Sequence, residues 1–356
     1  MKSATPFLYG LCYNNTVTKS SLRIKIWRVK FMGTLNLAIL GAGKIAETMA
    51  RTIAGLEDVK AYAVASRDMD KAKDFAEKFG FEKAYGSYEE MLADPQIGLV
   101  YVATPHSHHF DHCKLCIEAG KPILCEKAFT ANAEQAEELC RLAKEKNVFM
   151  TEAIWTRYMP FLATMKEVIA SGVIGAPCLL TGNLGYTLNH VQRMQDPALA
   201  GGSLLDLGVY AINFASMIFG TEVEKVSSVC TYTDTGMDEQ NSITIIFKDK
   251  KMAVLNSTMM GMSDRKGIIY GSKGFIVIEN INNFESMKVF NEQYKEIASY
   301  QRPDQITGYE YEVIASKKAL EEGRLECEEM PHEETIRVMK MMDTLRHEWG
   351  VRYPFE

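Results

Sequence analysis

Residues 41–46 carry the first motif that could do chemistry. They read Gly-Ala-Gly-Lys-Ile-Ala, which fits the G-x-G-x-x-G/A fingerprint of dinucleotide-binding proteins. Gly41 would allow a tight turn, and Gly43 would let backbone N–H groups approach a pyrophosphate. The residues predicted to bind a dinucleotide here are Gly41, Gly43, Lys44 and Ile45. The alternative is a glycine-rich turn without a ligand.

The end of the second expected strand decides the type of dinucleotide. NAD-binding proteins tend to place an acid there, against the ribose 2′-hydroxyl, whereas NADP-binding proteins place a cation near the 2′-phosphate. This chain has Ser66 and Arg67 at that point. Arginine offers planar donors that match phosphate, so we predict NADP, with NAD less favoured. In the alternative, Asp68 caps the next helix and Arg67 is solvated surface.

Four histidines and two cysteines fall within residues 106–116, a density that suggests a metal site. On a helix, however, His108 and His112 share one face while His109 and Cys113 share another, so the candidate ligands are split. We therefore predict no metal. The residues expected at the carboxyl edge of the sheet, beside the cofactor, are Thr104, Pro105 and His108.

Glu126 and Lys127 follow an apolar strand at the same edge, where open α/β sheets bind ligands. A lysine that is partly desolvated beside a nicotinamide can exchange a proton with a hydroxyl or a carbonyl. Lys127 is therefore a catalytic candidate and Glu126 a cofactor-binding candidate. By itself such a pair is also common on protein surfaces.

Residues 203–219 are apolar nearly all round, as in a buried helix. Asp206 and Tyr210 are four residues apart and Asn213 is seven from Asp206, so they form one polar stripe. A buried carboxylate is costly unless it is paired. The stripe is therefore either an internal hydrogen-bond network or the wall of a polar pocket, and we favour the pocket.

The elements that must position these residues are those of an α/β protein with two domains. Short apolar runs alternate with amphipathic stretches up to about residue 155, which is typical of a parallel Rossmann sheet. The strands expected there are residues 35–40, 60–65, 83–85, 99–103, 122–125 and 148–151. The helices expected between them are residues 44–53, 70–79, 108–118 and 133–146, the last capped by Asn132.

The second domain is predicted to be α+β with an open, mostly antiparallel sheet. Its expected strands are residues 178–185, 243–247, 252–257, 268–270 and 275–279, the last four as two hairpins. Its expected helices are residues 160–170 and 203–219, and residues 309–322 and 333–349 form two more. The predicted domains are residues 32–155 for cofactor binding, with 306–356 packing back on it, and residues 156–305 for substrate binding and oligomerisation.

One face of the second sheet would remain open if helix 203–219 covers the other. We expect that open face to expose Ile243, Ile245 and Phe247 or their neighbours, and an exposed apolar patch usually marks an interface. A two-fold homodimer is therefore predicted. In the alternative, residues 280–302 cover the face.

Composition excludes several classes of protein. The chain has 356 residues, 47% of them hydrophobic and 24% charged, which is typical of a soluble globular protein. The net charge is −6, and the first 31 residues carry six Lys and Arg and no acid, so the body is more acidic still. Neither nucleic acid nor a membrane is expected as a partner.

Residues 1–31 are interpreted as an upstream extension before Met32, or else as a targeting peptide. The scattered cysteines favour a reducing, cytoplasmic compartment.

The order of these motifs resembles the Gfo/Idh/MocA oxidoreductases, the relatives of glucose-fructose oxidoreductase and inositol dehydrogenase. The matching segments, in chain order, are residues 41–46, 103–105 with His108, 125–127, 152–157, and 201–202 with 206–210. The string Glu-Ala-Ile-Trp-Thr-Arg at 152–157 is similar to the dimeric dihydrodiol dehydrogenase branch. The resemblance spans about residues 35–350.

The resemblance implies hydride transfer between NADP and an alcohol or carbonyl carbon. Lys127 and Tyr210 would transfer the proton, Asp206 would orient them or the substrate, and Trp155 and Arg157 would lie near cofactor and substrate. The implied substrate-binding residues are Lys127, Trp155, Asp206 and Tyr210. This chain departs from the family at Ala128, where Pro is usual, and at Tyr210, where many members have His.

The sequence therefore predicts an NADP-dependent oxidoreductase acting on a sugar, a cyclic polyol or a vicinal diol, with no metal needed. A second substrate class, an imine or a linear aldehyde, fits the same fold. The alternative from another class is a regulatory protein that senses NADP and has lost the chemistry. The joint presence of Lys127, Asp206 and Tyr210 argues for the enzyme.

Overall fold

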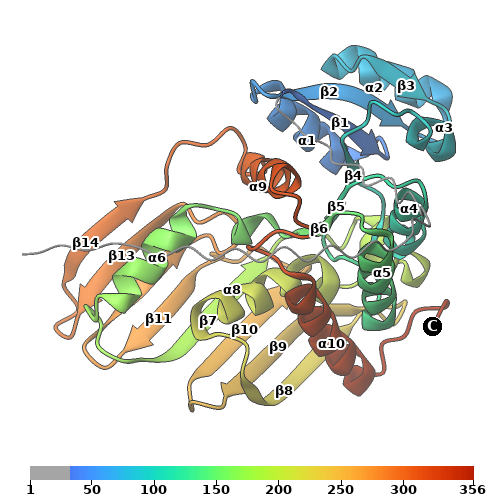
Figure 1. Ribbon diagram of the computed structural model, residues 1–356. Coiled ribbons are helices and arrows are strands. Elements are labelled where there is room, and N and C mark those ends of the chain that lie inside the picture. The colour runs from blue at the N-terminus through green and yellow to red at the C-terminus, as the bar shows by residue number, and fades with distance from the viewer. Residues whose placement is uncertain (1–32) are drawn as a thin grey trace, which may run out of the picture.

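The structure is a computed structural model that describes residues 33–356, and it contains two sheets (Figure 1). The first is parallel, with strand order β3-β2-β1-β4-β5-β6. Its strands are β1 Leu35–Leu40, β2 Val59–Ala65, β3 Lys83–Tyr85, β4 Leu99–Val102, β5 Ile123–Glu126 and β6 Met150–Ala153. The helices between them are α1 Lys44–Ala54, α2 Met69–Phe79, α3 Tyr88–Leu92, α4 His106–Glu118 and α5 Ala133–Lys146. This confirms the predicted Rossmann sheet.

Local sequence signals, namely apolar runs and a helix cap, predict the positions of these strands and helices to within about two residues. Every residue of β4 and β5 is buried, as expected for inner strands covered by helices on both faces. The Asn132 side chain accepts a hydrogen bond from the amide of Gln135, which confirms the predicted cap of α5. The expected strand at 148–151 is displaced by two residues, and α3 was not predicted.

The second sheet has eight strands in the order β14-β13-β12-β11-β7-β10-β9-β8. Only the β7–β10 pair is parallel, and the predicted β9–β10 and β11–β12 hairpins are confirmed. The strands are β7 Pro177–Gly185, β8 Val223–Tyr232, β9 Asp238–Phe247, β10 Met252–Thr258, β11 Gly267–Gly271, β12 Gly274–Glu279, β13 Ser286–Asn291 and β14 Glu296–Gln301. β8, β13 and β14 were not predicted.

Helices cover one face of this sheet (Figure 1). They are α6 Phe161–Ala170, α8 Val209–Phe219 and α10 His332–Trp349. The expected helix 203–219 is buried but not uniform, because a π-helical turn, η3 Leu204–Gly208, precedes α8. The helical stretch Pro197–Phe219 is apolar and long enough to cross a membrane, but 94% of its apolar window is buried in the fold, as in a core helix.

The prediction for the open face was wrong in its named residues. Ile243, Ile245 and Phe247 are buried toward the helices, and Phe247 makes an edge contact with Phe219 of α8 at 5.6 Å. Because side chains alternate along a strand, Thr244 and Ile246 lie on the other face. Residues 280–302 do not cover that face either, since they form β13 and β14 and lengthen the sheet.

The last part of the chain contacts the first sheet. Leu325 O accepts a hydrogen bond from the amide of Met150, the first residue of β6, and His332 Nε2 lies 2.8 Å from the carbonyl oxygen of that residue. α10 also packs on α5 and α8. The exact domain boundaries stay a prediction.

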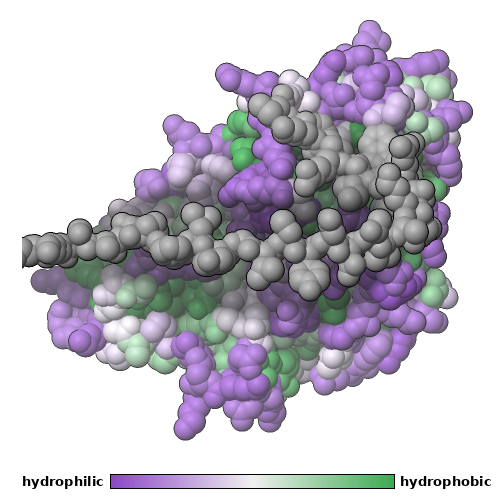
Figure 2. Space-filling model, in the orientation of Figure 1, coloured by the Kyte–Doolittle hydropathy of each residue, from purple (hydrophilic) through white to green (hydrophobic). Residues whose placement is uncertain are grey.

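On the face seen in Figure 2, hydrophobic surface gathers over the second sheet, while the Rossmann part at the top is mostly hydrophilic.

Candidate active site

The turn after β1 has the geometry that a pyrophosphate requires. Gly41 has φ +104°, and a Cβ on it would lie 2.9 Å from Thr104 Cγ2. Gly43 precedes α1 without any side-chain cap, so the first amides of the helix point outward without a side-chain acceptor. Both features fit a dinucleotide at this turn, because backbone amides at a free helix N-terminus attract phosphate.

Ser66 and Arg67 lie directly after β2. Ser66 is buried and its Oγ accepts a hydrogen bond from the amide of Asp68 at 3.2 Å. Asp68 caps α2, as the alternative interpretation supposed. Arg67 is exposed, so its guanidinium is available for a 2′-phosphate. The choice of NADP stays a prediction.

The histidines of the segment 106–112 have different partners. Thr104 Oγ1 lies 3.0 Å from His112 Nδ1, while His108 is half-buried, 3.2 Å from Ser107 Oγ, on the first turns of α4 after Pro105. His109 is fully buried between carbonyl oxygens, with Nε2 2.7 Å from Thr104 O and Nδ1 2.9 Å from the carbonyl of residue 128. His109 therefore ties the β4 edge to the segment after Lys127. Among residues 33–356, no three His, Cys, Asp or Glu side chains gather as metal ligands.

Lys127 extends from the end of β5 to η3. Its Nζ donates to Asp206 O at 2.9 Å and to Asp206 Oδ1 at 3.2 Å, and it lies 5.0 Å from the centre of the Tyr210 ring. The Lys127 side chain is 14% exposed and that of Asp206 is 8% exposed. The Lys127–Ala128 peptide bond is cis. Lys127, Asp206 and Tyr210, which the sequence separates by up to 83 positions, are thus brought together.

Asp206 has a second cation partner that the sequence analysis missed. Arg193, on the short helix α7 Gln192–Gln195, donates to both carboxylate oxygens at 3.2 Å, and its side chain is 44% exposed. Burial would raise the pKa of Asp206, but the attraction of Lys127 and Arg193 outweighs it and holds the pKa below its usual range. Asp206 is therefore an ionised carboxylate between two cations.

His106 is a neutral neighbour of this cluster. Its Nε2 lies 3.9 Å from Asp206 Oδ1, and its Nδ1 lies 3.3 Å from Ala200 O. Burial lowers the pKa of His106 to about 3, against the opposing pull of Asp206. His106 therefore adds no charge at neutral pH.

Tyr210 belongs to an aromatic group. Trp155 Nε1 donates to the Tyr210 hydroxyl at 3.1 Å, and the Trp155 ring stacks on Tyr309 with centroids 4.3 Å apart. Burial, together with Tyr309 and Glu126, raises the pKa of Tyr210 well above its usual value. Tyr210 is thus a neutral phenol, and its own O–H has no acceptor among residues 33–356.

Glu126 lies beneath this group. It is buried, accepts hydrogen bonds from the Tyr101 hydroxyl and from the amide of Lys127, and has its pKa raised by burial, with Lys127 opposing. Glu312, on α9 Glu310–Glu321, is fully buried nearby, and burial raises its pKa well above the usual value. Burial therefore disfavours a negative charge on both carboxyl groups.

Arg157 belongs to a buried polar network, and its place relative to cofactor and substrate stays a prediction. It closes the short 3-10 helix η1 Trp155–Arg157, and its guanidinium donates to Asn213 at 2.6 Å, to Ser216 at 2.7 Å and to Glu334 of α10. These contacts place it in a buried network between α8 and α10 instead of in the Lys127 cluster. The polar stripe of residues 203–219 therefore divides: Asp206 and Tyr210 face Lys127, and Asn213 joins Arg157.

The residues that sequence reasoning missed lie on or beside helix starts and on a short helix. Arg193 is on α7, His106 is the first residue of α4 and was passed over in favour of His108, and Tyr309 precedes α9. No local spacing links Arg193 or Tyr309 to the cluster. For His106, the signal was its place as the first residue of α4.

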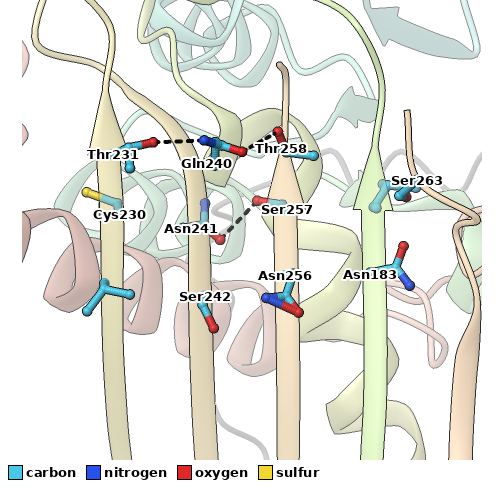
Figure 3. A pocket seen from close by; sticks show the side chains of 12 residues that line it. Asn183, Cys230, Thr231, Gln240, Asn241, Ser242, Asn256, Ser257, Thr258 and Ser263 are labelled. Atoms are coloured by element: carbon cyan, nitrogen blue, oxygen red, sulfur yellow. Dashed lines mark hydrogen bonds between the residues drawn. The ribbon is translucent and has the colours of Figure 1, made fainter. Parts of the chain in front are cut away.

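Two cavities lie away from this cluster. One, of about 510 Å³, is on the open face of the second sheet and is lined by amides, hydroxyls, Val229, Leu184 and the Cys230 thiol (Figure 3). The other, of about 750 Å³, lies between the start of α5 and the C-terminal residues. The first has no carboxylate, amine or imidazole and the second lacks the Lys127 group, so neither is assigned to the acid–base chemistry.

Two family models match this chain. Residues 35–153 match the Gfo/Idh/MocA oxidoreductase family with an NAD-binding Rossmann fold, and residues 162–277 match the C-terminal domain of the same family. The sequence resemblance is therefore confirmed for both parts of the chain.

Relatives match over nearly their whole length. Trans-1,2-dihydrobenzene-1,2-diol dehydrogenase of Mus musculus is 32% identical over 333 residues, covering 90% of this chain and 98% of that protein. The enzyme of the same name from Xenopus tropicalis is 34% identical, covering 89% and 98%. D-xylose 1-dehydrogenase (NADP(+)) of Hypocrea jecorina is 34% identical, covering 90% and 93%.

Solved structures share the fold. A 3-ketoreductase from Actinomadura kijaniata, in complex with NADP and TDP-benzene, has a TM-score of 0.81 at 22% identity, covering 88% of this chain and 98% of that one. Levoglucosan dehydrogenase in complex with NADH has a TM-score of 0.79 at 19% identity, covering 89% and 97%. At these identities the likeness concerns the fold, and it confirms the combination of a parallel and a mostly antiparallel sheet.

Proposed function

Because the chain belongs to the Gfo/Idh/MocA oxidoreductase family, we propose that it uses NADP to oxidise a CH–OH group of a sugar, a cyclic polyol or a vicinal diol, or to reduce the corresponding carbonyl. The observation that carries this proposal is the Lys127–Asp206–Tyr210 cluster at the carboxyl edge of the Rossmann sheet. Relatives over 30% identical act, by their names, on a dihydrodiol and on a pentose.

The cofactor would be held by the turn at Gly41 and Gly43 and by the first amides of α1, with Arg67 toward the 2′-phosphate. Bound NADP supplies the hydride acceptor, and NADPH the hydride donor for the reverse direction. All proton handling is left to the side chains of this chain, because the cluster contains an amine, a carboxylate and a phenol.

Lys127 is the group proposed to exchange the substrate proton. Its Nζ has two acceptors on Asp206, and an ammonium has three donors, so one N–H remains for a substrate oxygen. Asp206 orients Lys127 and stabilises its charged form. In reduction, the Lys127 ammonium donates a proton to the carbonyl oxygen as the hydride reaches carbon, which leaves Lys127 as an amine. In oxidation the steps run in reverse: the ammonium first loses a proton to solvent, and the resulting amine takes the substrate O–H proton as the hydride leaves carbon.

Tyr210 is proposed to hold the substrate oxygen as a neutral hydrogen-bond donor. The raised pKa of its phenol argues against a role as the base at neutral pH. Trp155 donates to the Tyr210 oxygen and so orients its O–H. This division of labour differs from the expectation that both residues transfer the proton.

A turnover panel tests the proposal. The purified chain is mixed with NADP or NAD and with aldoses, inositols, trans-dihydrodiols and linear alcohols, and reduction of the nicotinamide is followed by its absorbance. We expect turnover on at least one cyclic polyol, sugar or diol, with NADP preferred. The NADP-sensing alternative predicts cofactor binding without turnover on any of them, in both directions.

We also propose that the protein is a homodimer joined through the open face of the second sheet. By strand register, one row of side chains crosses six neighbouring strands of this face: Ile246, Met252, Leu179, Tyr270, Phe275 and Phe290. None of them is fully buried, and contiguous apolar surface favours association. Light scattering at micromolar concentration should give twice the 40.0 kDa chain mass, and Leu179→Lys should weaken the dimer. A monomer mass for the unmodified chain would reject this proposal.

We also propose a cytoplasmic location. In residues 33–356 all seven cysteines are free, five of them buried. Free thiols support a reducing, cytoplasmic location.

A further inference from the structure

A buried acid lies against the start of the helix that carries Asp206 and Tyr210. Asp238, the first residue of β9, is fully buried. Its Oδ2 accepts hydrogen bonds from the amide of Leu204 at 2.7 Å and from Asn241 Nδ2 at 3.1 Å. Its Oδ1 has no partner among the described residues. Asp238 therefore anchors the first amide of η3.

The backbone at Gly201 and Gly202, just before this helix, is tightly packed. Gly202 has φ +111°, and any Cβ on it would collide with the Asp238 carboxylate. A Cβ on Gly201 would lie 2.7 Å from Met194 O, and Gly201 O accepts a hydrogen bond from the Tyr353 hydroxyl at 3.1 Å. The chain is thus held on three sides just before η3.

A polar network surrounds this anchor on the helix-covered side of the second sheet. Ser257 Oγ donates to Asn241 Oδ1 at 3.0 Å and also lies 3.0 Å from Ser203 Oγ (the Asn241–Ser257 bond is drawn in Figure 3). Asn241 and Ser257 are also among the residues that line the 510 Å³ cavity. Asp238 is therefore the one carboxylate of a network that is otherwise made of amides and hydroxyls.

We propose that Asp238 is a positioning residue for the reaction: its carboxylate fixes the first turn of the helix and thereby keeps Asp206 and Tyr210 directed toward Lys127. This inference rests on the proposed function, because it concerns the same cluster. Asp206 follows Leu204 by only two residues, so a shift of the Leu204 amide moves the Asp206 backbone oxygen that Lys127 contacts.

The charge of Asp238 should matter near neutral pH. Burial raises the pKa of Asp238 to about 7, against the stabilising hydrogen bonds from Leu204 and Asn241. The other titratable groups that face it are Arg346, Tyr353 and Cys230. Arg346 is already paired with Asp343 and Glu356. A carboxylate accepts from a helix N-terminus better than a neutral acid does, so positioning should improve as pH rises through 7.

Asp238→Asn tests the inference, with Asp234→Asn as the control, since Asp234 is exposed in the neighbouring β8–β9 turn. We expect kcat of Asp238→Asn to fall about tenfold, NADPH affinity to change less than about twofold, and the rise of kcat near pH 7 to disappear. Asp234→Asn should behave as the unmodified protein. An Asp238→Asn variant with an unchanged kcat and an unchanged pH profile would overturn the inference.

A second measurement does not depend on turnover. The indole N–H of Trp155 contacts Tyr210, so its NMR resonance reports the position of Tyr210. It should shift in Asp238→Asn and not in Asp234→Asn; an unmoved resonance contradicts the positioning role even if no substrate is found. Where Asp238→Asn does not fold, Asn241→Ser removes one donor, which should raise the pKa of Asp238 and move the kcat inflection to higher pH. An unmoved inflection again contradicts it.

Discussion

Two buried carboxylates lie near the start of the helix formed by η3 and α8: Asp206 on the helix itself and Asp238 on β9. Their pKa values are shifted in opposite directions. Asp206 faces the Rossmann edge and lies between Lys127 and Arg193, so its pKa is held below the usual range despite burial. Asp238 faces the second sheet, where burial prevails because its hydrogen-bond partners are neutral, and its pKa rises to about 7.

The difference shows that burial alone does not set the charge of a carboxyl group. Burial opposes ionisation in both, and only cations within about 3 Å overcome it at Asp206. The Rossmann side therefore offers a fixed charge pair for chemistry. The second-sheet side offers a group whose charge changes near neutral pH.

The largest expected effect comes from removing Lys127, the cation that Asp206 has and Asp238 lacks. Lys127→Ala should lower kcat at least about a hundredfold, the usual size of an acid–base contribution, with little change in NADPH affinity. Lys127→Arg is the matched control: it keeps a charge beside Asp206 but does not release a proton, so it should leave kcat low. Steady-state rates and cofactor titration measure both. Turnover of Lys127→Ala within a few-fold of the unmodified enzyme would place Lys127 outside the chemistry.

The neutral neighbour of Asp206 gives a prediction on stability. The folded pKa of His106, about 3, is below its unfolded value of 6.5, so the unfolded state binds more protons and the fold loses stability as pH falls below 6.5. From pH 7.5 to pH 5 this loss should reach about 2 kcal/mol, at 1.36 kcal/mol per pKa unit. Urea unfolding of His106→Asn and of the unmodified chain at both pH values measures it. An equal pH dependence for the two proteins would show that folding does not lower the pKa of His106.

The next prediction concerns Arg67, an exposed cation that is proposed to bind the 2′-phosphate. If it meets the 2′-phosphate, Arg67→Ala should raise the Kd for NADPH about tenfold or more, since a charge-assisted bond contributes about 1.5–3 kcal/mol. The Kd for NADH should change little, which makes NADH the internal control. Equal losses for both cofactors in fluorescence titrations would refute the assignment.

The smallest expected effect belongs to the exposed partner of Asp206. Arg193→Gln removes one of two cations, so the pKa of Asp206 should rise and the acid limb of kcat/KM should move to higher pH. Because Arg193 is 44% exposed and screened by solvent, kcat at pH 8 should stay within about threefold. Arg265→Gln, at a distance in the β10–β11 connection, serves as control. An unmoved acid limb would mean that Lys127 alone keeps Asp206 ionised.

Much of the candidate site could be predicted because its parts are local. The fingerprint at residues 41–46, the strand that ends at Glu126 and the polar stripe of Asp206 and Tyr210 are all readable from spacing. The predictions that failed depend on which face of a strand a residue occupies, or on contacts with residues far away in the sequence. Ile243 was expected on the open face, yet a shift of one residue reverses the face of a strand. Arg193 was not expected beside Asp206, because it comes from the separate short helix α7.

The sequence by itself determined the alternation of strands and longer helices in the Rossmann part, the free N-terminus of α1 and the residue types available for chemistry, because hydrophobic period and helix caps act over a few neighbouring positions. Only the tertiary structure decided which carboxylate is charged. Asp206 and Asp238 have the same side chain and similar burial, and they differ because β5 and α7 bring cations to one and β9 holds the other against neutral donors. Electrostatic energy depends on distances between segments far apart in the chain, which no local pattern encodes.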